Sequence, residues 1–203
     1  MADQLLTPED LASLLERDDI DRSKAVMLIE CVTAVIQEAT GGQRIVLVEN
    51  DTFKIMATRD QWLALPQIPV VSVASVDIDG NALTEGTGFK RFGNRLWRKQ
   101  GWSNRCTYPW TVPQILYGQD LPQVNGVYSH GFADGSQDLQ LARAAGISIL
   151  KGVYGNPTGA TSEAIDDYSV SYELLAVQLE ASPYLKAALR SKYGRRAGIV
   201  RVG

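Results

Sequence analysis

The segment VVSVASVDIDGN, residues 70–81, decides the fold that we expect for this chain of 203 residues. Its first nine residues are rich in β-branched side chains, which pack well on a pleated surface and favour extended backbone. Asp79-Gly80-Asn81 then supplies the glycine that a tight hairpin turn needs. The segment therefore predicts a strand over Val70–Ile78 that turns back at Gly80.

Outward from this strand, the hydrophobic pattern keeps a period of two, which is typical of strands. The further strands expected from it are Ile45–Val48 and Thr52–Ile55 around an Asn50-Asp51 turn, Phe89–Arg91 and Leu96–Arg98 around Gly93-Asn94, and Gln123–His130. Hairpins of this kind build antiparallel sheets. Residues 44–130 are therefore expected to form a small antiparallel β unit.

The two ends of the chain carry helical signals instead. Thr7-Pro8-Glu9-Asp10 combines a capping residue, a proline at the first helical position and the acid of a capping box. A second helix is expected from about Asp21 to the stop at Gly41-Gly42, with Cys31 in its apolar register. Apolar residues at helical spacing run again from Ser136 to Gly155, and Ser182-Pro183 opens a last helix that ends before Gly194.

These signals predict an α+β fold, in which a helical bundle of N- and C-terminal helices carries one inserted small antiparallel β unit. The expected boundaries place the helical core at residues 1–43 and 131–193, the β-rich insertion at 44–130 and an extended C-terminal tail at 194–203. Tyr168, Val170 and Tyr172 alternate with serines, which suggests an extended arm at a subunit interface.

Composition excludes several classes of protein. With 45% hydrophobic and 21% charged residues the chain is ordinary for a globular protein, and it is long enough to bury a core without disulfides. Cys31 and Cys106 lie far apart, and neither belongs to a CxxC motif. No apolar run is long enough to span a membrane, and the first residues are acidic where a secretory signal would be basic. We expect a soluble intracellular protein without membrane contact.

The net charge of −3 hides an uneven distribution. Residues 1–21 carry seven acids against Arg17 alone, whereas residues 186–203 and 90–105 each carry six bases and no acid. Opposite charges of this kind can set the register between neighbouring subunits, or the basic segments can bind nucleic acid or an acidic protein. For any single cluster, a solvated charged surface or a loose tail is the favoured interpretation.

Residues that carry chemistry are few. The chain has no P-loop and one histidine, His130, whose place at a strand end favours a structural role. Glu163, Asp166 and Asp167 could pair as acid and base, although most proteins of this size offer such a pair. We therefore expect no catalytic residue, no cofactor and no metal site.

The stretch from Phe89 to Trp110 is the most unusual in composition. Its aromatic residues alternate with basic ones: Phe89, Phe92, Trp97, Trp102, Tyr108 and Trp110 with Lys90, Arg91, Arg95, Arg98, Lys99 and Arg105. Aromatic rings beside cations are how many modules hold single-stranded nucleic acid, and they are also common in protein interfaces. Part of this set is expected to face the core of the β unit.

Three groups of residues, taken in order, resemble a known family. They are Leu6–Leu11 with the helix ending Thr40-Gly41-Gly42; Leu65–Val70 running into SVASVDIDG, with Leu96-Trp97 and Trp102; and Val127–Phe132 with Asn156–Gly159, Ser162-Glu163 and Asp167–Tyr172. This order is similar to that of head-to-tail adaptor (connector, or head completion) proteins of tailed bacteriophages, in particular phages of actinobacteria. The likeness extends from about Leu6 to Tyr193.

The resemblance implies a virion structural protein without catalytic residues, located in the neck between capsid and tail and made in the host cytoplasm. About twelve copies would form a ring under the portal, and duplex DNA would pass through it without sequence-specific binding. The next connector, stopper or tail protein would bind on the other side. The portal-binding residues implied lie in the C-terminal segment: Lys186, Arg190, Lys192, Tyr193, Arg195, Arg196, Ile199 and Arg201.

Two alternatives of other classes stay open from the residues alone. One is a nucleic-acid-binding module that uses the Phe89–Trp110 stretch. The other is an enzyme that uses His130, or Glu163 with Asp167, as acid and base.

Overall fold

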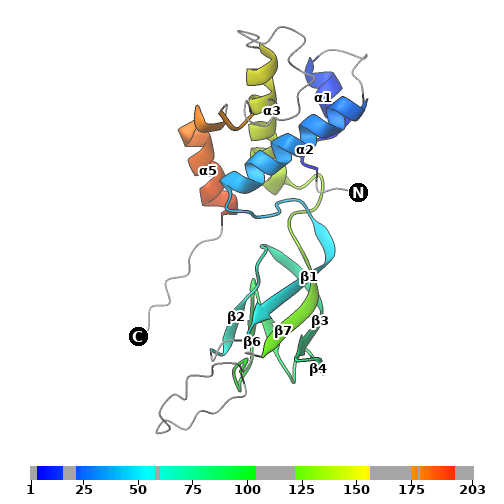
Figure 1. Ribbon diagram of the computed structural model, residues 1–203, viewed down its shortest axis with the longest axis vertical. Helices are drawn as coiled ribbons and strands as arrows, with labels where there is room; N and C mark the ends of the chain where they lie inside the picture. The colour runs from blue at the N-terminus through cyan, green and yellow to red at the C-terminus, as the bar shows by residue number, and fades with distance from the viewer. Residues whose placement is uncertain are drawn as a thin grey trace. The chain divides into compact units, whose positions relative to one another are not determined.

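The computed structural model describes residues 4–15, 22–57, 60–103, 122–155, 175–177 and 179–194. The chain divides into two compact units (Figure 1). The helical unit comprises Met1–Leu47 and Phe132–Gly203, and the β unit is Val48–Gly131. Each unit has its own hydrophobic core among the described residues.

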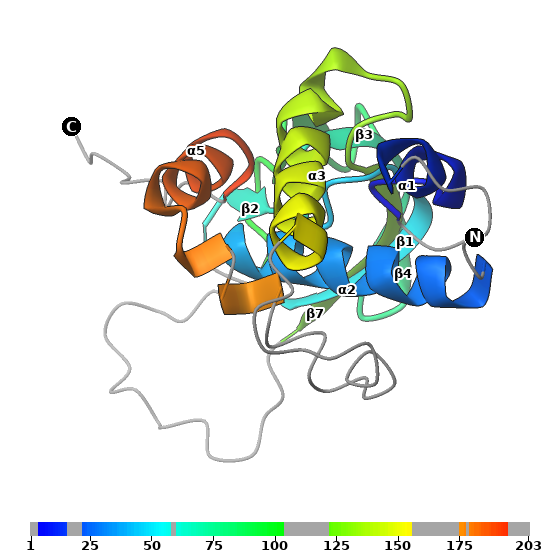
Figure 2. The ribbon, with the colours of Figure 1, turned by 90° about the horizontal axis from the view of Figure 1, so that it is seen from above.

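The helical unit is built around α2, Arg22–Ala39, which contacts three other helices. These are α1 (Pro8–Leu15), α3 (Gln140–Gly155) and α5 (Pro183–Tyr193), and a 3₁₀ turn η1 (Gln137–Leu139) leads into α3. Figure 2 shows α3 crossing α2, with α1 and α5 on opposite sides of α3. The core between these helices is almost entirely aliphatic, and Cys31 lies buried in it as predicted.

Local signals set the helix ends where the sequence predicts them. The Thr7 amide donates to Asp10 Oδ2 at 2.9 Å, and the Asp10 amide donates to Thr7 Oγ1 at 3.1 Å. This reciprocal pair is the capping box, which satisfies amides that the first turn leaves without an intrahelical partner. At the other end of the chain α5 begins at Pro183 and is capped by Gly194, both as predicted.

The β unit contains seven strands among its described residues, arranged in two antiparallel sheets. One sheet has the order β1-β7-β3-β4, and the other has the order β2-β6-β5. The strands are β1 (Val48–Met56), β2 (Trp62–Ala64), β3 (Val70–Ile78), β4 (Asn81–Leu83), β5 (Lys90–Phe92), β6 (Arg95–Trp97) and β7 (Gln123–His130). The predicted hairpins at Gly80 and at Gly93-Asn94 are confirmed as β3–β4 and β5–β6.

This architecture corrects the predicted fold class. The molecule is not a helical bundle with one small β unit, because its β part consists of two sheets around a core of their own. Phe53, Val76 and Tyr128 from the four-stranded sheet meet Leu63 and Leu96 from the three-stranded sheet in that core. Hydrophobic period alone cannot show how many sheets a set of short strands forms, because that depends on which strands pair. β2, which pairs with β6, is absent from the strands predicted from the sequence.

The predicted turn at Asn50-Asp51 is wrong as well. β1 runs straight through these residues, with an irregularity in its pairing to β7 between Val48 and Asp51. Asn50 takes a left-handed conformation, φ 54°, at this bulge, and its amide donates to Ser129 Oγ at 3.2 Å. An Asn-Asp pair is compatible with a hairpin turn, but in this structure it forms a β-bulge.

No helix among the described residues is long and apolar enough to cross a membrane.

Candidate functional site

The outer surface of the three-stranded sheet gathers aromatic and basic side chains. Strand pairing places Trp62, Trp97 and Lys90 in one row, and Ala64, Arg95 and Phe92 in another. Because successive side chains on a strand point to opposite sides, these two rows share one side of the sheet. We call these six residues the aromatic–basic face.

The row between them faces the core. It consists of Leu63, Leu96 and Arg91; both leucines are buried in the core, whereas Arg91, on the edge strand β5, is exposed. On the aromatic–basic face, in contrast, Trp62 is 46% exposed and Phe92 is 53% exposed. Both rank among the large apolar side chains that the described residues expose, although burial would stabilise each by about 2 kcal/mol. Their exposure therefore marks a candidate binding surface.

The rings on this face have a defined geometry. Trp62 and Phe92 lie edge to face, with centroids 5.5 Å apart and an interplanar angle of 65°. Gln61 accepts a hydrogen bond from Trp97 Nε1 at 3.3 Å, and its side-chain amide donates to the Lys99 carbonyl at 2.8 Å. The Gln61 carbonyl also accepts from the Arg98 amide at 2.9 Å. Gln61 is thus a positioning residue, since its hydrogen bonds hold the Trp97 ring at the end of β6, the central strand of the sheet.

Only part of the predicted aromatic and basic stretch reaches this face. Phe89 and Trp102 are buried in the β core, and Trp102 Nε1 donates to the Gln61 carbonyl at 3.0 Å. Arg91 donates to the Val70 carbonyl and Arg98 to the Gly101 carbonyl. Arg105, Tyr108 and Trp110 lie outside the described residues. Trp62 belongs to the face but not to the predicted stretch, and only the pairing of β2 with β6 could have found it.

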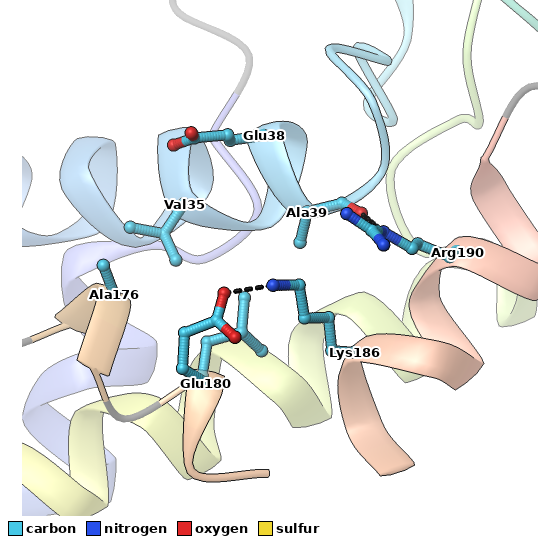
Figure 3. A pocket seen from close by; sticks show the side chains of 8 residues that line it. Val35, Glu38, Ala39, Ala176, Glu180, Lys186 and Arg190 are labelled. Carbon is cyan, nitrogen blue, oxygen red and sulfur yellow. Dashed lines mark hydrogen bonds and ion pairs between the residues drawn. The ribbon is translucent and has the colours of Figure 1, made fainter. Parts of the chain in front are cut away.

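A second candidate surface is a pocket of about 250 Å³ in the helical unit, between α2, α5 and the residues Ala176, Leu179 and Glu180 (Figure 3). Four of its eight lining residues are apolar, and the other four are two acids and two bases. The lining residues are Val35, Glu38, Ala39, Ala176, Leu179, Glu180, Lys186 and Arg190. The charges balance, so the pocket attracts no ion of one sign.

Two predicted portal-binding residues, Lys186 and Arg190, line this pocket, and both interact with other residues of the same chain. Lys186 pairs with Glu180, and Arg190 Nε donates to the Ala39 carbonyl at 3.0 Å (Figure 3). Ala39 is the last residue of α2, where carbonyls lack intrahelical partners. The guanidinium of Arg190 therefore caps α2 and ties α5 to it.

The next two predicted portal-binding residues also make intrachain contacts. Lys192 lies 3.6 Å from an Asp138 carboxylate oxygen. Tyr193 is buried against Phe132, and its hydroxyl donates to the Asp138 carbonyl and accepts from the Ala142 amide at 3.3 Å. Burial raises the pKa of the Tyr193 hydroxyl, and the Asp138 charge adds to this rise.

The other residues predicted for the portal and for the subunit interface lie outside the described residues. They are Arg195, Arg196, Ile199 and Arg201 for the portal, and Tyr168, Val170 and Tyr172 for the interface. Their roles stay predictions.

His130 ends β7 and is fully buried, as a structural residue would be. Its Nε2 lies 2.9 Å from Asp51 Oδ2, and its ring lies 4.9 Å from that of Tyr128. Nδ1 has no hydrogen-bond partner among the described residues. Ser129 Oγ accepts from the Asn50 amide at the bulge. The His130–Asp51 pair therefore joins β7 to the β1 bulge.

The predicted acid–base group Glu163, Asp166 and Asp167 lies outside the described residues, as does Cys106. Across the part of the chain that the structure describes, no group of three or more histidine, cysteine or acidic side chains could hold a metal ion.

Comparison of the chain with models of known protein families finds no match, and comparison with curated proteins finds none at a significant level.

Proposed function

We propose that this chain is a head-to-tail adaptor subunit of a tailed bacteriophage. In the virion neck, about twelve copies form a ring that binds the portal on one side and the next connector or tail protein on the other. The ring extends the channel through which duplex DNA passes. The work of such a subunit is assembly, and it requires no catalytic residue.

One observation carries the proposal, namely the order of residue groups along the chain. Thr7–Asp10, the strand of residues 70–78 and the segment 127–132 follow one another as they do in the adaptor proteins that this chain resembles. In the structure these groups start α1, form β3 and end β7, so each lies at an element boundary or in a sheet. We take this shared order, rather than any single motif, as support for a shared chain path.

The end of α5 supports a role for the segment that follows it. Tyr193 is buried in the helical core and Arg190 caps α2, so the last turn of α5 is held at two points. Directly after the Gly194 cap the sequence reads RRAGIVRVG, with three arginines and no acid. A basic segment that starts from a fixed point suits an acidic groove on a partner, because the cost of ordering it is reduced at its anchored end.

The test is to image the purified protein by negative-stain electron microscopy, alone and mixed with the portal protein of the same phage. We expect an added ring beneath the portal, whose symmetry gives the number of subunits. A protein that never binds the portal at high concentration would contradict the proposal.

A matched pair of variants tests where the portal binds. Truncation after Gly194 removes Arg195, Arg196, Ile199 and Arg201 but keeps Tyr193 in the core, so portal binding should be lost while the helical circular dichroism signal is unchanged. Lys54→Ala, on β1, is the control that removes an exposed positive charge from the other unit. A truncated protein that binds with full affinity would refute the role of this segment.

A further inference from the structure

We propose that the aromatic–basic face of the β2-β6-β5 sheet binds single-stranded nucleic acid without sequence preference. The inference rests on the β unit alone and is independent of the adaptor proposal. Its ligand chemistry is that of an unpaired strand, which offers phosphates for cations and base faces for aromatic rings. RNA and DNA share this chemistry, and the experiment below separates them.

The first argument is the kind of apolar group that the face presents. Of its six residues Trp62, Phe92 and Trp97 are aromatic, and Ala64 is the only aliphatic one. Two of the rings are about half exposed, at 46% and 53%, and they lie within 5.5 Å of each other. Flat ring surfaces match nucleobases, each of which has a π-face, so stacking does not depend on base identity.

The second argument is charge. Lys90 and Arg95 are exposed on the same face, and neither has a carboxylate partner among the described residues. β2, β5 and β6 contain no acidic residue, although the whole chain has a net charge of −3. Unpaired cations beside rings attract a polyanion, and their release of counterions makes the affinity depend on salt.

The third argument is rigidity. Gln61 fixes Trp97 through hydrogen bonds to its ring and to the Lys99 carbonyl, and buried Leu63 and Leu96 anchor the strands from the other side. A platform held in this way loses little conformational entropy when a ligand stacks on it. Duplex DNA cannot use it, because its bases are already stacked on one another.

The experiment measures the binding of a fluorescein-labelled oligothymidylate of about twelve nucleotides to the full-length protein by fluorescence anisotropy. Since Lys90 and Arg95 can neutralise two phosphates, we expect the affinity to fall roughly sevenfold between about 50 mM and about 200 mM salt. Oligouridylate in place of oligothymidylate tells whether the face prefers RNA or DNA. Binding of a duplex as tight as that of the single strand would overturn the proposal.

Variants on and off the face locate the site. Trp62→Ala should weaken binding by roughly 5- to 100-fold, and Trp62→Phe should restore most of it, since stacking needs a ring. Arg95→Ala should reduce the dependence on salt. Met56→Ala and Lys54→Ala make the same kinds of change on exposed positions of β1 and should leave the affinity unchanged. Equal losses in these controls would refute the assignment.

Two further outcomes would overturn the proposal. If truncation after Gly194 abolishes oligonucleotide binding, the basic C-terminal segment is the site rather than the sheet. If polyglutamate competes as well as unlabelled oligothymidylate, the face recognises charge alone, and an acidic protein segment becomes its ligand.

Thermal unfolding of the Trp62→Ala variant is the control for folding. An unfolding temperature equal to that of the wild type shows that the variant loses binding without losing its fold.

Discussion

The two units of this protein stabilise their cores in different ways. The helical core is aliphatic apart from Cys31 and Tyr193, with many small and medium side chains from helices near both ends of the chain. The β core is smaller and relies on large rings, with Phe53, Phe89, Trp102 and Tyr128 among its buried residues. Short strands contribute few inward side chains each, so large ones are needed to fill the space between two sheets.

The two units also differ in the sequence range of the contacts that hold them, and this range determines how each unit responds to a substitution. A helix end depends on residues three or four positions apart, such as Thr7 and Asp10, so its signals are local. The central strand β7 pairs with β1 and β3, which precede it by dozens of residues. Errors in the β unit therefore disturb long-range pairing. All four tryptophans, Trp62, Trp97, Trp102 and Trp110, belong to the β unit, so tryptophan fluorescence reports its unfolding and circular dichroism at 222 nm reports mainly the helices.

The largest expected effect comes from one methyl group added to a central strand of the β unit. A Cβ on Gly126 of β7 would lie 2.4 Å from the Ser75 carbonyl and 2.7 Å from the Phe53 ring, so Gly126→Ala must displace backbone. We expect it to reduce the free energy of unfolding of the β unit by about 3 kcal/mol. Chemical denaturation followed by tryptophan fluorescence measures this change.

Gly146→Ala in α3 is the matched change in the helical unit. Its Cβ would meet only side-chain methyl groups, Val32 Cγ1 at 3.2 Å and Leu6 Cδ1 at 3.3 Å. The gain of about 1 kcal/mol in helix propensity offsets this crowding, so its net effect should stay within about 1 kcal/mol. If Gly146→Ala proves the more harmful of the two, the contrast between the units is wrong.

The next effect tests the bond between β7 and the β1 bulge. His130→Phe keeps a ring beside Tyr128 but loses the hydrogen bond to Asp51, and it should lower the stability of the β unit by about 2 kcal/mol. Fluorescence-detected denaturation measures it. Asp51→Ala combined with His130→Phe should cost less than the sum of the two single changes, because both remove the same bond. Full additivity would show that the pair is not coupled.

A smaller effect concerns the anchor of α5. Tyr193→Phe removes the hydroxyl that bonds Asp138 and Ala142, which should cost the helical unit about 1 kcal/mol at neutral pH. Because burial raises the pKa of Tyr193 in the folded state, its contribution is complete below the unfolded value near 10 and falls as the pH rises above it. The gap between wild type and Tyr193→Phe, followed at 222 nm, should therefore narrow above about pH 10. A gap that widens there would contradict the direction of the shift.

The smallest expected effect is the loss of a local cap. Thr7→Ala removes one half of the capping box and should lower the stability of the helical unit by about 1 kcal/mol or less, without moving the fluorescence transition. Ser13→Ala, an exposed change inside α1, is the control and should not be destabilising. A shift of the β-unit transition in Thr7→Ala would show that the two units unfold together.

The comparison also explains which features could be read from the sequence. The capping box, the helix start at Pro183 and the hairpins at Gly80 and Gly93 were predictable, since each depends on a few neighbouring residues. The bulge at Asn50 was not, because the same residues suit a turn and only the pairing with β7 decides between them. The division of the strands into two sheets was missed for the same reason.

The candidate binding surfaces, too, were determined partly by local sequence and partly by tertiary structure. By itself, the sequence determined the local conformations, the concentration of rings and bases between Phe89 and Trp110, and the basic end of the chain. Only the tertiary structure decided that Trp62 lies on the same face as that cluster, whereas Phe89 and Trp102 are buried in the core. It also decided that Arg190 caps α2 and that the Tyr193 hydroxyl donates to the Asp138 carbonyl in η1. The physical reason is that backbone preference acts over a few residues, whereas the side of a sheet on which a residue lies depends on pairing between distant strands.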